Sequence, residues 1–213
     1  MRIYTIGHST RTLDELVAAL RSYGIRTLAD IRTVPRSRHT PQFNREDLGP
    51  RLRDRGIDYR HLPGLGGLRK PRAGSTNTAW RNASFRGFAD YMETPAFAAA
   101  LDELRVLACD AGPVAMMCAE AVPWRCHRSL VADALVARGD TVFHIMGEAS
   151  ARPHTLTPWA KVEGALVTYP GEPSPRRGTS DSAEPPPAPT EPPARSTAGW
   201  GEASGRRGAR RSV

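Results

Sequence analysis

Short apolar runs alternate along this chain with longer segments of helical periodicity, and this alternation most constrains its fold. The run at residues 3–6 ends at Gly7, and the apolar residues of the next segment recur at the spacing of one helix face. Repeated strand–helix alternation is typical of a parallel sheet with helices on both faces. We therefore expect an α/β fold: a three-layer, open, mostly parallel sheet of about five strands. The expected strands are residues 3–6, 27–31, 57–62, 114–118 and 141–146, and the expected helices are 13–20, 44–55, 85–92, 95–108 and 126–138.

Three local features complete this prediction. Ser9 or Thr10 is expected to cap the first helix. Residues 64–82 are Gly-rich and too long for a simple turn, so we expect either a lid or a partly ordered functional segment. Residues 152–168 are expected to form an edge strand or a closing arm.

The chain divides into a predicted α/β domain at residues 1–169 and a Pro/Arg-rich tail at residues 170–213. The tail has almost no aliphatic residues and no periodicity, and residues 183–193 are dominated by proline. Such a composition buries too little apolar surface to offset the entropy of ordering, so we expect the tail to be disordered. The remaining length is ample for one hydrophobic core.

The formal net charge is +8, which favours anionic partners. Lys70 and Lys161 are the only lysines, and every other basic residue is arginine. A coding bias toward arginine therefore explains the excess of arginine as well as phosphate binding does. We expect a small anionic ligand and leave nucleic-acid binding open. Neither a cofactor nor the oligomeric state can be named from the sequence.

Three cysteines (Cys109, Cys118 and Cys126) and no apolar secretory signal argue against a disulfide scaffold. No stretch approaches the ~20 apolar residues of a membrane span. We therefore expect a cytoplasmic protein with free thiols and no membrane partner.

Residues 118–128, Cys-Ala-Glu-Ala-Val-Pro-Trp-Arg-Cys-His-Arg, hold the densest group of reactive side chains. They lie between an apolar run and a helical pattern, which predicts a buried strand, a tight loop and a helix. In open α/β sheets ligands bind at the carboxyl ends of the strands, against helix N-termini. The segment therefore falls where such a fold performs its chemistry.

This segment, Cys118-Ala-Glu followed by Pro and then Cys-His-Arg, resembles the signature of the DUF488 family of prokaryotic domains of unknown function. Residues 5–9, 28–32, 59–61 and 65–67 fit the same pattern, and the resemblance covers about residues 1–168. It implies a compact α/β domain and supplies no reaction.

Each expected strand ends in residues capable of chemistry, and the ends of parallel strands share one edge of a sheet. Burying His, Cys, Asp and Arg side chains at such an edge costs free energy. Their presence there therefore predicts a ligand-binding or catalytic cleft. These residues are His8 and Ser9, Asp30 and Arg32, His61, Cys118 and Glu120, and His144.

The two cysteines have open alternatives. Cys126 is the better thiolate candidate because a helix start and neighbouring arginines lower a thiol pKa, whereas Cys118 is either a nucleophile or a buried small hydrophobe. His127 follows Cys126 directly, and successive helical residues point about 100° apart. His8 or His144 from another strand is therefore the better base for either thiol.

Glu120 is the expected general acid or base. The alternative is a loop carboxylate that pairs with Arg125 or Arg128 or accepts backbone N–H groups at the helix start. Asp30 and Arg32 form either an ion pair or, through the arginine, part of an anion clamp. The catalytic candidates are Cys118, Glu120, Cys126 and His127, and the substrate-binding candidates are His8, Ser9, Asp30, Arg32, Ser37, Arg38, His61, Arg128 and His144.

Several familiar motifs are absent. A phosphatase-type Cys-x5-Arg loop would need arginine where Trp124 stands, and no Cys-x-x-Cys follows Cys118-Ala-Glu as in a deaminase. Residues 65–68 lack the pattern of a phosphate-binding loop and predict either a flexible turn or a close backbone approach to a ligand. We assign no metal site, because the adjacent Cys126–His127 pair is awkward for one tetrahedral ion, although a zinc site remains an alternative.

The leading functional hypothesis is an enzyme that acts on a small anionic or nucleotide-like substrate at the carboxyl edge of the sheet. A non-catalytic nucleic-acid-binding module and a thiol-based ligand or redox sensor are the alternatives.

We predict that truncation after about Tyr169 leaves the stability of the domain unchanged, because the tail has no apolar surface to contribute. Thermal unfolding of the truncated and full chains measures this, and a lower melting temperature of the truncated chain would contradict it.

Overall fold

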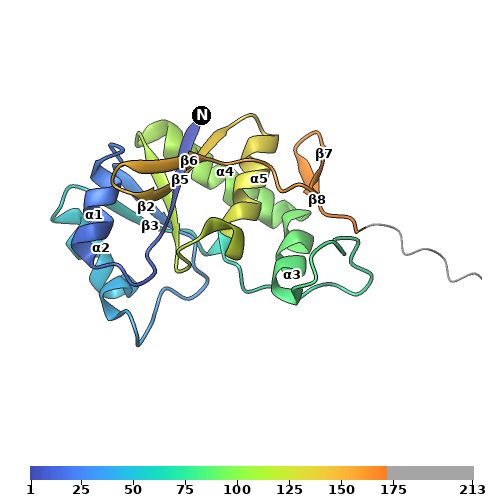
Figure 1. The fold of residues 1–213 in the computed structure, drawn as a ribbon, viewed down its shortest axis with the longest axis horizontal. Coiled ribbons are helices and arrows are strands. Elements are labelled where there is room, and N and C mark those ends of the chain that lie inside the picture. Colours follow the sequence, from blue (N-terminus) through green and yellow to red (C-terminus); the bar gives the residue numbers. More distant parts are fainter. Residues whose placement is uncertain (172–213) are drawn as a thin grey trace, which may run out of the picture. The chain divides into compact units, whose positions relative to one another are not determined.

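The computed structural model describes residues 1–171, so the predicted disorder of the tail lies, from residue 172 on, outside the described residues. Its centre is a six-stranded sheet of order β3-β2-β4-β1-β5-β6, in which β6 alone is antiparallel to its neighbour (Figure 1). The predicted α/β class and mostly parallel sheet are confirmed. The strands are β1 (Arg2–Gly7), β2 (Thr27–Asp30), β3 (Asp58–His61), β4 (Val114–Cys118), β5 (Thr141–Gly147) and β6 (Ser150–Pro153), with β7 (Lys161–Glu163) and β8 (Leu166–Thr168) in a separate hairpin. The helices are α1 (Leu13–Arg21), α2 (Arg45–Arg53), α3 (Ala83–Met92), α4 (Pro95–Asp110) and α5 (Arg128–Ala137), with single 3-10 turns η1 (Pro41–Phe43), η2 (Pro63–Leu65) and η3 (Pro123–Arg125).

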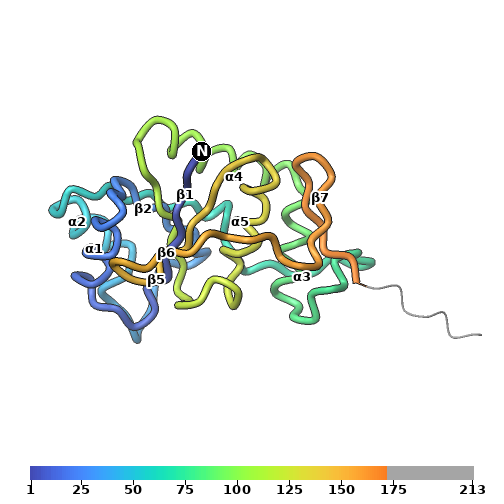
Figure 2. Tube along the Cα trace, turned by 45° about the horizontal axis from the view of Figure 1, so that its top comes forward, coloured from blue at the N-terminus to red at the C-terminus, as the bar shows by residue number. Residues whose placement is uncertain are grey.

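Helices cover both faces of the sheet, and each face has its own hydrophobic core. One core packs α1 and α2 against side chains such as Ile6, Leu28 and Met117. The other packs α3, α4 and α5 against the alternate residues of the same strands, such as Ala29 and Met116 (Figures 1 and 2). Because β4 lies between two strands and two layers, all five of its residues are buried, which explains its continuous apolar run.

The first helix begins at Leu13, as predicted, but its cap differs from the prediction. Thr12 caps α1, not Ser9 or Thr10. The Thr12 hydroxyl accepts the N–H of Glu15 at 3.2 Å, and the Glu15 carboxylate accepts the N–H of Thr12 at 2.7 Å, which forms a capping box. Ser9 does not serve as the cap because its backbone is left-handed, with φ of 48°, in the loop that leaves β1.

The long connection of residues 64–82 is tied to α3 by hydrogen bonds to one buried carboxylate. Asp90 accepts the N–H of Arg72 at 2.9 Å, the hydroxyl of Ser75 at 2.6 Å and the side-chain amide of Asn77 at 2.9 Å. Asn77, fully buried, also accepts the N–H of Tyr169 at 2.8 Å. The connection is therefore joined to the end of the described chain.

Residues 152–168 include only the last two residues of an edge strand, and the rest of this segment returns along the molecule as the predicted alternative, an arm. The edge strand is β6, and the chain then passes along α5 to the β7–β8 hairpin beside α3 (Figure 2). Contacts continue to Gly171, whose N–H donates to the hydroxyl of Thr78 at 3.0 Å. Within residues 1–171 no helix has both the length and the apolarity of a membrane-spanning segment.

Gly7 permits the close crossing of β1 and the loop after β4. A Cβ at this position would overlap the carbonyl oxygen of Glu120 and press on the guanidinium of Arg128. We predict that Gly7→Ala lowers the free energy of unfolding by about 3 kcal/mol, because backbone must move to admit the methyl group. Denaturant unfolding measures the change.

Gly147→Ala is the matched control, because a Cβ there meets no atom within 4 Å. We expect a change within about 0.5 kcal/mol for this variant. Equal stabilities of the Gly7→Ala and Gly147→Ala proteins would contradict the role given to Gly7.

Candidate functional site

Three side chains from the predicted segment converge at the carboxyl edge of the sheet. Cys118 is the last residue of β4, and Cys126 and His127 lie between η3 and α5. The two sulfur atoms and a ring nitrogen of His127 all lie within 4.8 Å of one another. We call these three residues the thiol–imidazole centre.

The placement of Cys126 corrects the sequence prediction. Cys126 was expected at the start of the helix, but it is extended, with φ of −137° and ψ of 144°, and α5 begins two residues later. The expectation that His127 turns away from its neighbour is therefore wrong, since the argument assumed helical geometry for both. Nδ1 of His127 lies 3.7 Å from Sγ of Cys126 and 3.9 Å from Sγ of Cys118.

The imidazole of His127 is held in one orientation. Its Nε2 lies 3.3 Å from the carbonyl oxygen of Ile31, which only accepts hydrogen bonds, so Nε2 carries the proton and the lone pair of Nδ1 faces the thiols. The ring meets Phe88 edge-on, with centroids 5.1 Å apart. A Cβ on Gly67 would overlap the imidazole, so this glycine provides a close backbone approach to the site.

The two thiols differ in their acidity. A hydrogen bond from Cys126, supported by His127 and Arg128, holds the pKa of Cys118 well below its ordinary value against the opposing effect of burial. The same hydrogen bond, together with burial, raises the pKa of Cys126 well above its ordinary value. Cys118 is therefore the more acidic of the two thiols, which reverses the preference for Cys126 drawn from the sequence.

A buried cation lies behind the centre. Arg128 is 1% exposed, and its Nη2 donates to the carbonyl oxygen of Ala121 at 3.1 Å. Among residues 1–171, no hydrogen-bond partner is present for its Nε and Nη1. Burial lowers the pKa of Arg128, whereas Cys126, Cys118 and Glu120 act against this effect. A buried guanidinium needs nearby negative charge, and the thiol of Cys118 and the carboxylate of Glu120 act in this sense.

The centre lies in a pocket of about 400 Å³, which we call the edge pocket. Glu120 and Arg125 are exposed at its border, and Arg32 also lines it. Glu120 forms no ion pair with Arg125 or Arg128 within the described part of the chain, contrary to the alternative prediction. The carboxylate is therefore available to a ligand.

Arg32 connects the edge pocket to a second polar group. Its Nε and Nη2 donate to the Asp30 carboxylate at 2.9 and 2.5 Å, so the predicted ion pair is formed and is buried. Its Nη1 lies 3.3 Å from Nε2 of His8, which stacks on Phe43. Burial and Arg32 lower the pKa of His8. Tyr59 completes the group by donating its hydroxyl to Asp30 at 2.7 Å.

Eight predicted residues do not line the edge pocket: His8, Ser9, Asp30, Ser37, Arg38, His61, Arg128 and His144. Ser9 contacts the loop after β4 through its N–H, which donates to Ala119. The Ser37 hydroxyl accepts two N–H groups of its own turn, Arg38 is exposed on that turn, and His61 bonds the carbonyl of Arg32. The expected convergence is therefore partial, because Ser37 and Arg38 lie on the loop after β2 and the imidazole of His61 bonds backbone.

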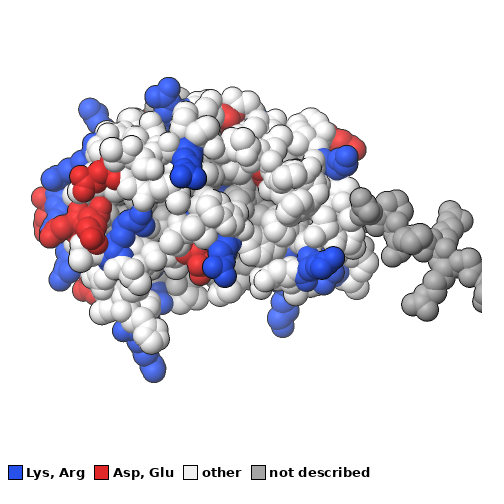
Figure 3. All heavy atoms as spheres, in the orientation of Figure 1, with Lys and Arg blue, Asp and Glu red and all other residues white. Residues whose placement is uncertain are grey.

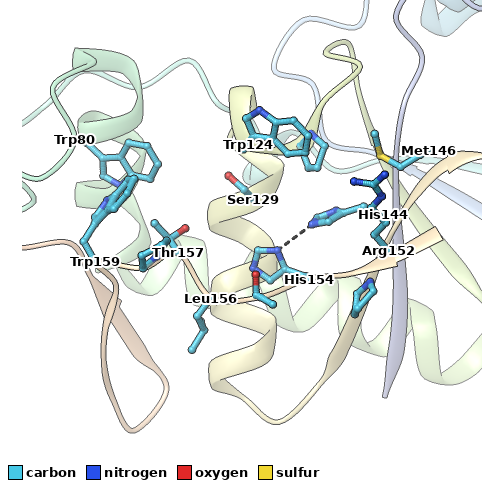
Figure 4. Close-up of a pocket in the computed structure, with 14 residues that line it drawn as sticks. Trp80, Trp124, Ser129, His144, Met146, Arg152, His154, Leu156, Thr157 and Trp159 are labelled. Atoms are coloured by element: carbon cyan, nitrogen blue, oxygen red, sulfur yellow. Dashed lines mark hydrogen bonds between the residues drawn. The ribbon is translucent and has the colours of Figure 1, made fainter. Parts of the chain in front are cut away.

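The prediction that His144 lies at the end of its strand is also wrong. His144 lies in the middle of β5, where its backbone is in register with Thr5 of β1. It lines a second pocket of about 420 Å³, the tryptophan pocket, whose walls include Trp80, Trp124 and Trp159 (Figure 4).

A buried hydrogen-bond chain begins at His144 and was missed from the sequence. Thr5 bonds Nδ1 of His144 at 2.8 Å, and Nε2 of His144 bonds His154 at 2.9 Å (Figure 4). His154 bonds Asp133 at 2.8 Å, and Asp133 also accepts the hydroxyl of Tyr169 at 2.8 Å. The available signal was a carboxylate amid the apolar residues of α5, since a buried carboxylate needs donors.

The fold and site define a doubly covered α/β domain with a thiol–imidazole centre at the carboxyl edge of its parallel sheet. Residues 12–135, more than half of the chain, match the family described as Domain of unknown function DUF488. The chain belongs to this family, as its resemblance indicated. No curated protein and no solved structure matches the chain.

Burial, with His154 and Arg128, lowers the pKa of His144 to about 3. The unfolded chain, with an ordinary histidine pKa of about 6.5, then binds a proton that the folded chain does not bind between these values. We predict that stability falls as the pH drops below about 6.5, with a contribution from His144 of up to about 1.4 kcal/mol per pH unit.

Denaturant unfolding between pH 6.5 and pH 4 measures this slope in the wild type and in His144→Gln, which should be flatter. The exposed His39 offers a control, and His39→Gln should keep the wild-type slope. Equal slopes for all three proteins would contradict the assignment.

Proposed function

We propose that the protein is an enzyme that acts on a small anionic substrate in the edge pocket, with the thiol–imidazole centre as its reactive group. The observation that carries the proposal is the convergence of Cys118, Cys126 and His127 in a pocket backed by the buried charge of Arg128. Packing of a hydrophobic core does not require such a group of side chains: two buried thiols, an oriented imidazole and a buried cation without a carboxylate partner. Perturbed, converging groups of this kind are typical of active sites.

The anionic character of the substrate is argued from charge. Arg125 is exposed at the border of the pocket and has no ion-pair partner among the described residues. Arg128 adds positive potential from behind the centre. A volume of about 400 Å³ lies within the usual range for small-molecule sites. A substrate bearing a phosphate or carboxylate group fits this combination.

Glu120 is the proposed proton carrier. It lines the pocket two residues after Cys118, is exposed, and has no partner that would neutralise its carboxylate in residues 1–171. A positioned carboxylate near a reacting group contributes about 10²–10⁴-fold to rate. The imidazole of His127 faces the two thiols, so we assign proton transfer to the substrate to Glu120 and not to His127.

The nucleic-acid alternative has less support. On the face seen in Figure 3, basic side chains are scattered and acidic ones lie among them, so no continuous basic stripe is present there. A thiol redox sensor is the second candidate, because the paired sulfur atoms of Cys118 and Cys126 serve that role equally well.

A turnover screen of small phosphate and carboxylate compounds with the full chain tests the proposal. We predict that Glu120→Gln lowers kcat of the substrate found by about 100-fold or more, with an unchanged melting temperature because Glu120 is exposed. Cys118→Ser and Cys126→Ser should abolish turnover. Cys109→Ser, at an exposed cysteine outside the pocket, should retain it.

Substrate binding is tested separately. Arg125→Gln should raise KM about tenfold, which corresponds to a lost exposed charge contact of ~1.4 kcal/mol. Arg51→Gln, on the outer surface of α2, is the control and should leave KM unchanged. Normal turnover by Glu120→Gln and by both cysteine variants would exclude this site as the catalytic one.

A further inference from the structure

We infer that Cys118, Cys126 and His127 bind one divalent metal ion of the zinc type, with a fourth coordination position open to the edge pocket. The inference rests on the function proposed above, because it assigns the centre of the same site. It concerns metal binding itself, however, which is measurable without a substrate.

The distances between the donor atoms suit a tetrahedral ion. Zinc lies about 2.3 Å from thiolate sulfur and about 2.0–2.1 Å from imidazole nitrogen, which places tetrahedral sulfur and nitrogen ligands about 3.6 Å apart. Nδ1 of His127 lies 3.7 and 3.9 Å from the two sulfur atoms. All three donors lie within 4.8 Å of one another, so small side-chain rotations suffice to close the site around an ion.

The orientation of His127 is that of a metal ligand. Metal-binding histidines usually donate their second ring N–H to a carbonyl or carboxylate, which fixes the tautomer and directs the free lone pair at the metal. Here Nε2 faces the carbonyl oxygen of Ile31 at 3.3 Å, and Nδ1 faces the two thiols. The backbone of Gly67 and the ring of Phe88 hold the imidazole in this position.

The adjacency of Cys126 and His127 does not prevent shared coordination. The objection from the sequence assumed that both residues lie in a helix, where their side chains diverge. Cys126 is extended and His127 is helical, and this change of backbone conformation directs both side chains at Cys118. Thiolate and imidazole donors together favour zinc and similar ions over magnesium or calcium.

Three protein ligands and an open position are typical of catalytic rather than structural zinc sites. Among residues 1–171, no fourth His, Cys, Asp or Glu joins the three donors. Two thiolates neutralise a divalent ion, and Arg128 then leaves the buried group with one positive charge. An anion entering the edge pocket would restore neutrality, which agrees with the anionic substrate proposed above.

Metal content is the first measurement. The full chain, purified without chelators, should contain about one equivalent of zinc by mass spectrometry, whereas Cys118→Ser, Cys126→Ser and His127→Ala should contain almost none. Cys109→Ser keeps all three ligands and should retain the full equivalent. A wild-type protein that binds no zinc, even after incubation with excess zinc and removal of the free ion, would overturn the inference.

Cobalt substitution tests the ligands without any variant. The chelator-treated wild type, loaded with Co²⁺, should show intense tetrahedral d–d bands and a thiolate-to-cobalt charge-transfer band. X-ray absorption of the zinc form should give two sulfur neighbours and nitrogen or oxygen for the rest. Absence of the charge-transfer band, or a sulfur count of zero or four, would contradict the assignment.

The outcomes separate this inference from the proposed function. A protein that binds no zinc but turns over a compound of the screen would overturn the metal site and leave the enzyme proposal intact. One bound zinc with the expected two sulfur ligands would support the metal site even if no compound in the screen were turned over.

Discussion

The buried guanidinium of Arg128 is the constraint on which the site depends. It is among the largest fully buried side chains, and only one hydrogen bond to the protein is formed within the described residues. A charge in this position costs several kcal/mol unless negative groups approach it. Gly7 leaves the space that the guanidinium and the loop after β4 occupy, and the more acidic thiol of Cys118 and the carboxylate of Glu120 act in favour of the charge. The loop after β4 and the start of α5 are therefore constrained by this charge as well as by apolar packing.

The sequence predicts the elements of this fold better than the orientation of their side chains. The apolar run of β4 and the periodic leucines of α1 correctly indicated a buried central strand and an amphipathic helix. Periodicity shows which residues are buried, but a parallel strand buried on both faces gives no sign of which face each residue takes. For that reason His144 was placed at the carboxyl edge, although it lies within β5 and faces α5 and the tryptophan pocket.

Loop conformation accounts for the other differences. Nothing in the composition of residues 119–127 shows that Cys126 is extended before the helix begins, yet this conformation brings three donors together. The family match covers residues 12–135, so it includes the thiol–imidazole centre but not β1. Gly7 and His8 support the site from outside the matched segment. Long-range supports of this kind are invisible to a local motif, because they depend on the pairing of β1 with β4.

Asp133 lies on the helix that begins at the site, and its two oxygens accept hydrogen bonds from His154, Thr157 and Tyr169. These donors all belong to the segment that follows β6. Helix α5 is therefore held at its start by the buried Arg128 and further along by the hydrogen bonds that this returning segment donates to Asp133. The stiffness of the centre is therefore partly determined some 30 residues further along the chain, and loss of that segment would leave a buried carboxylate without donors.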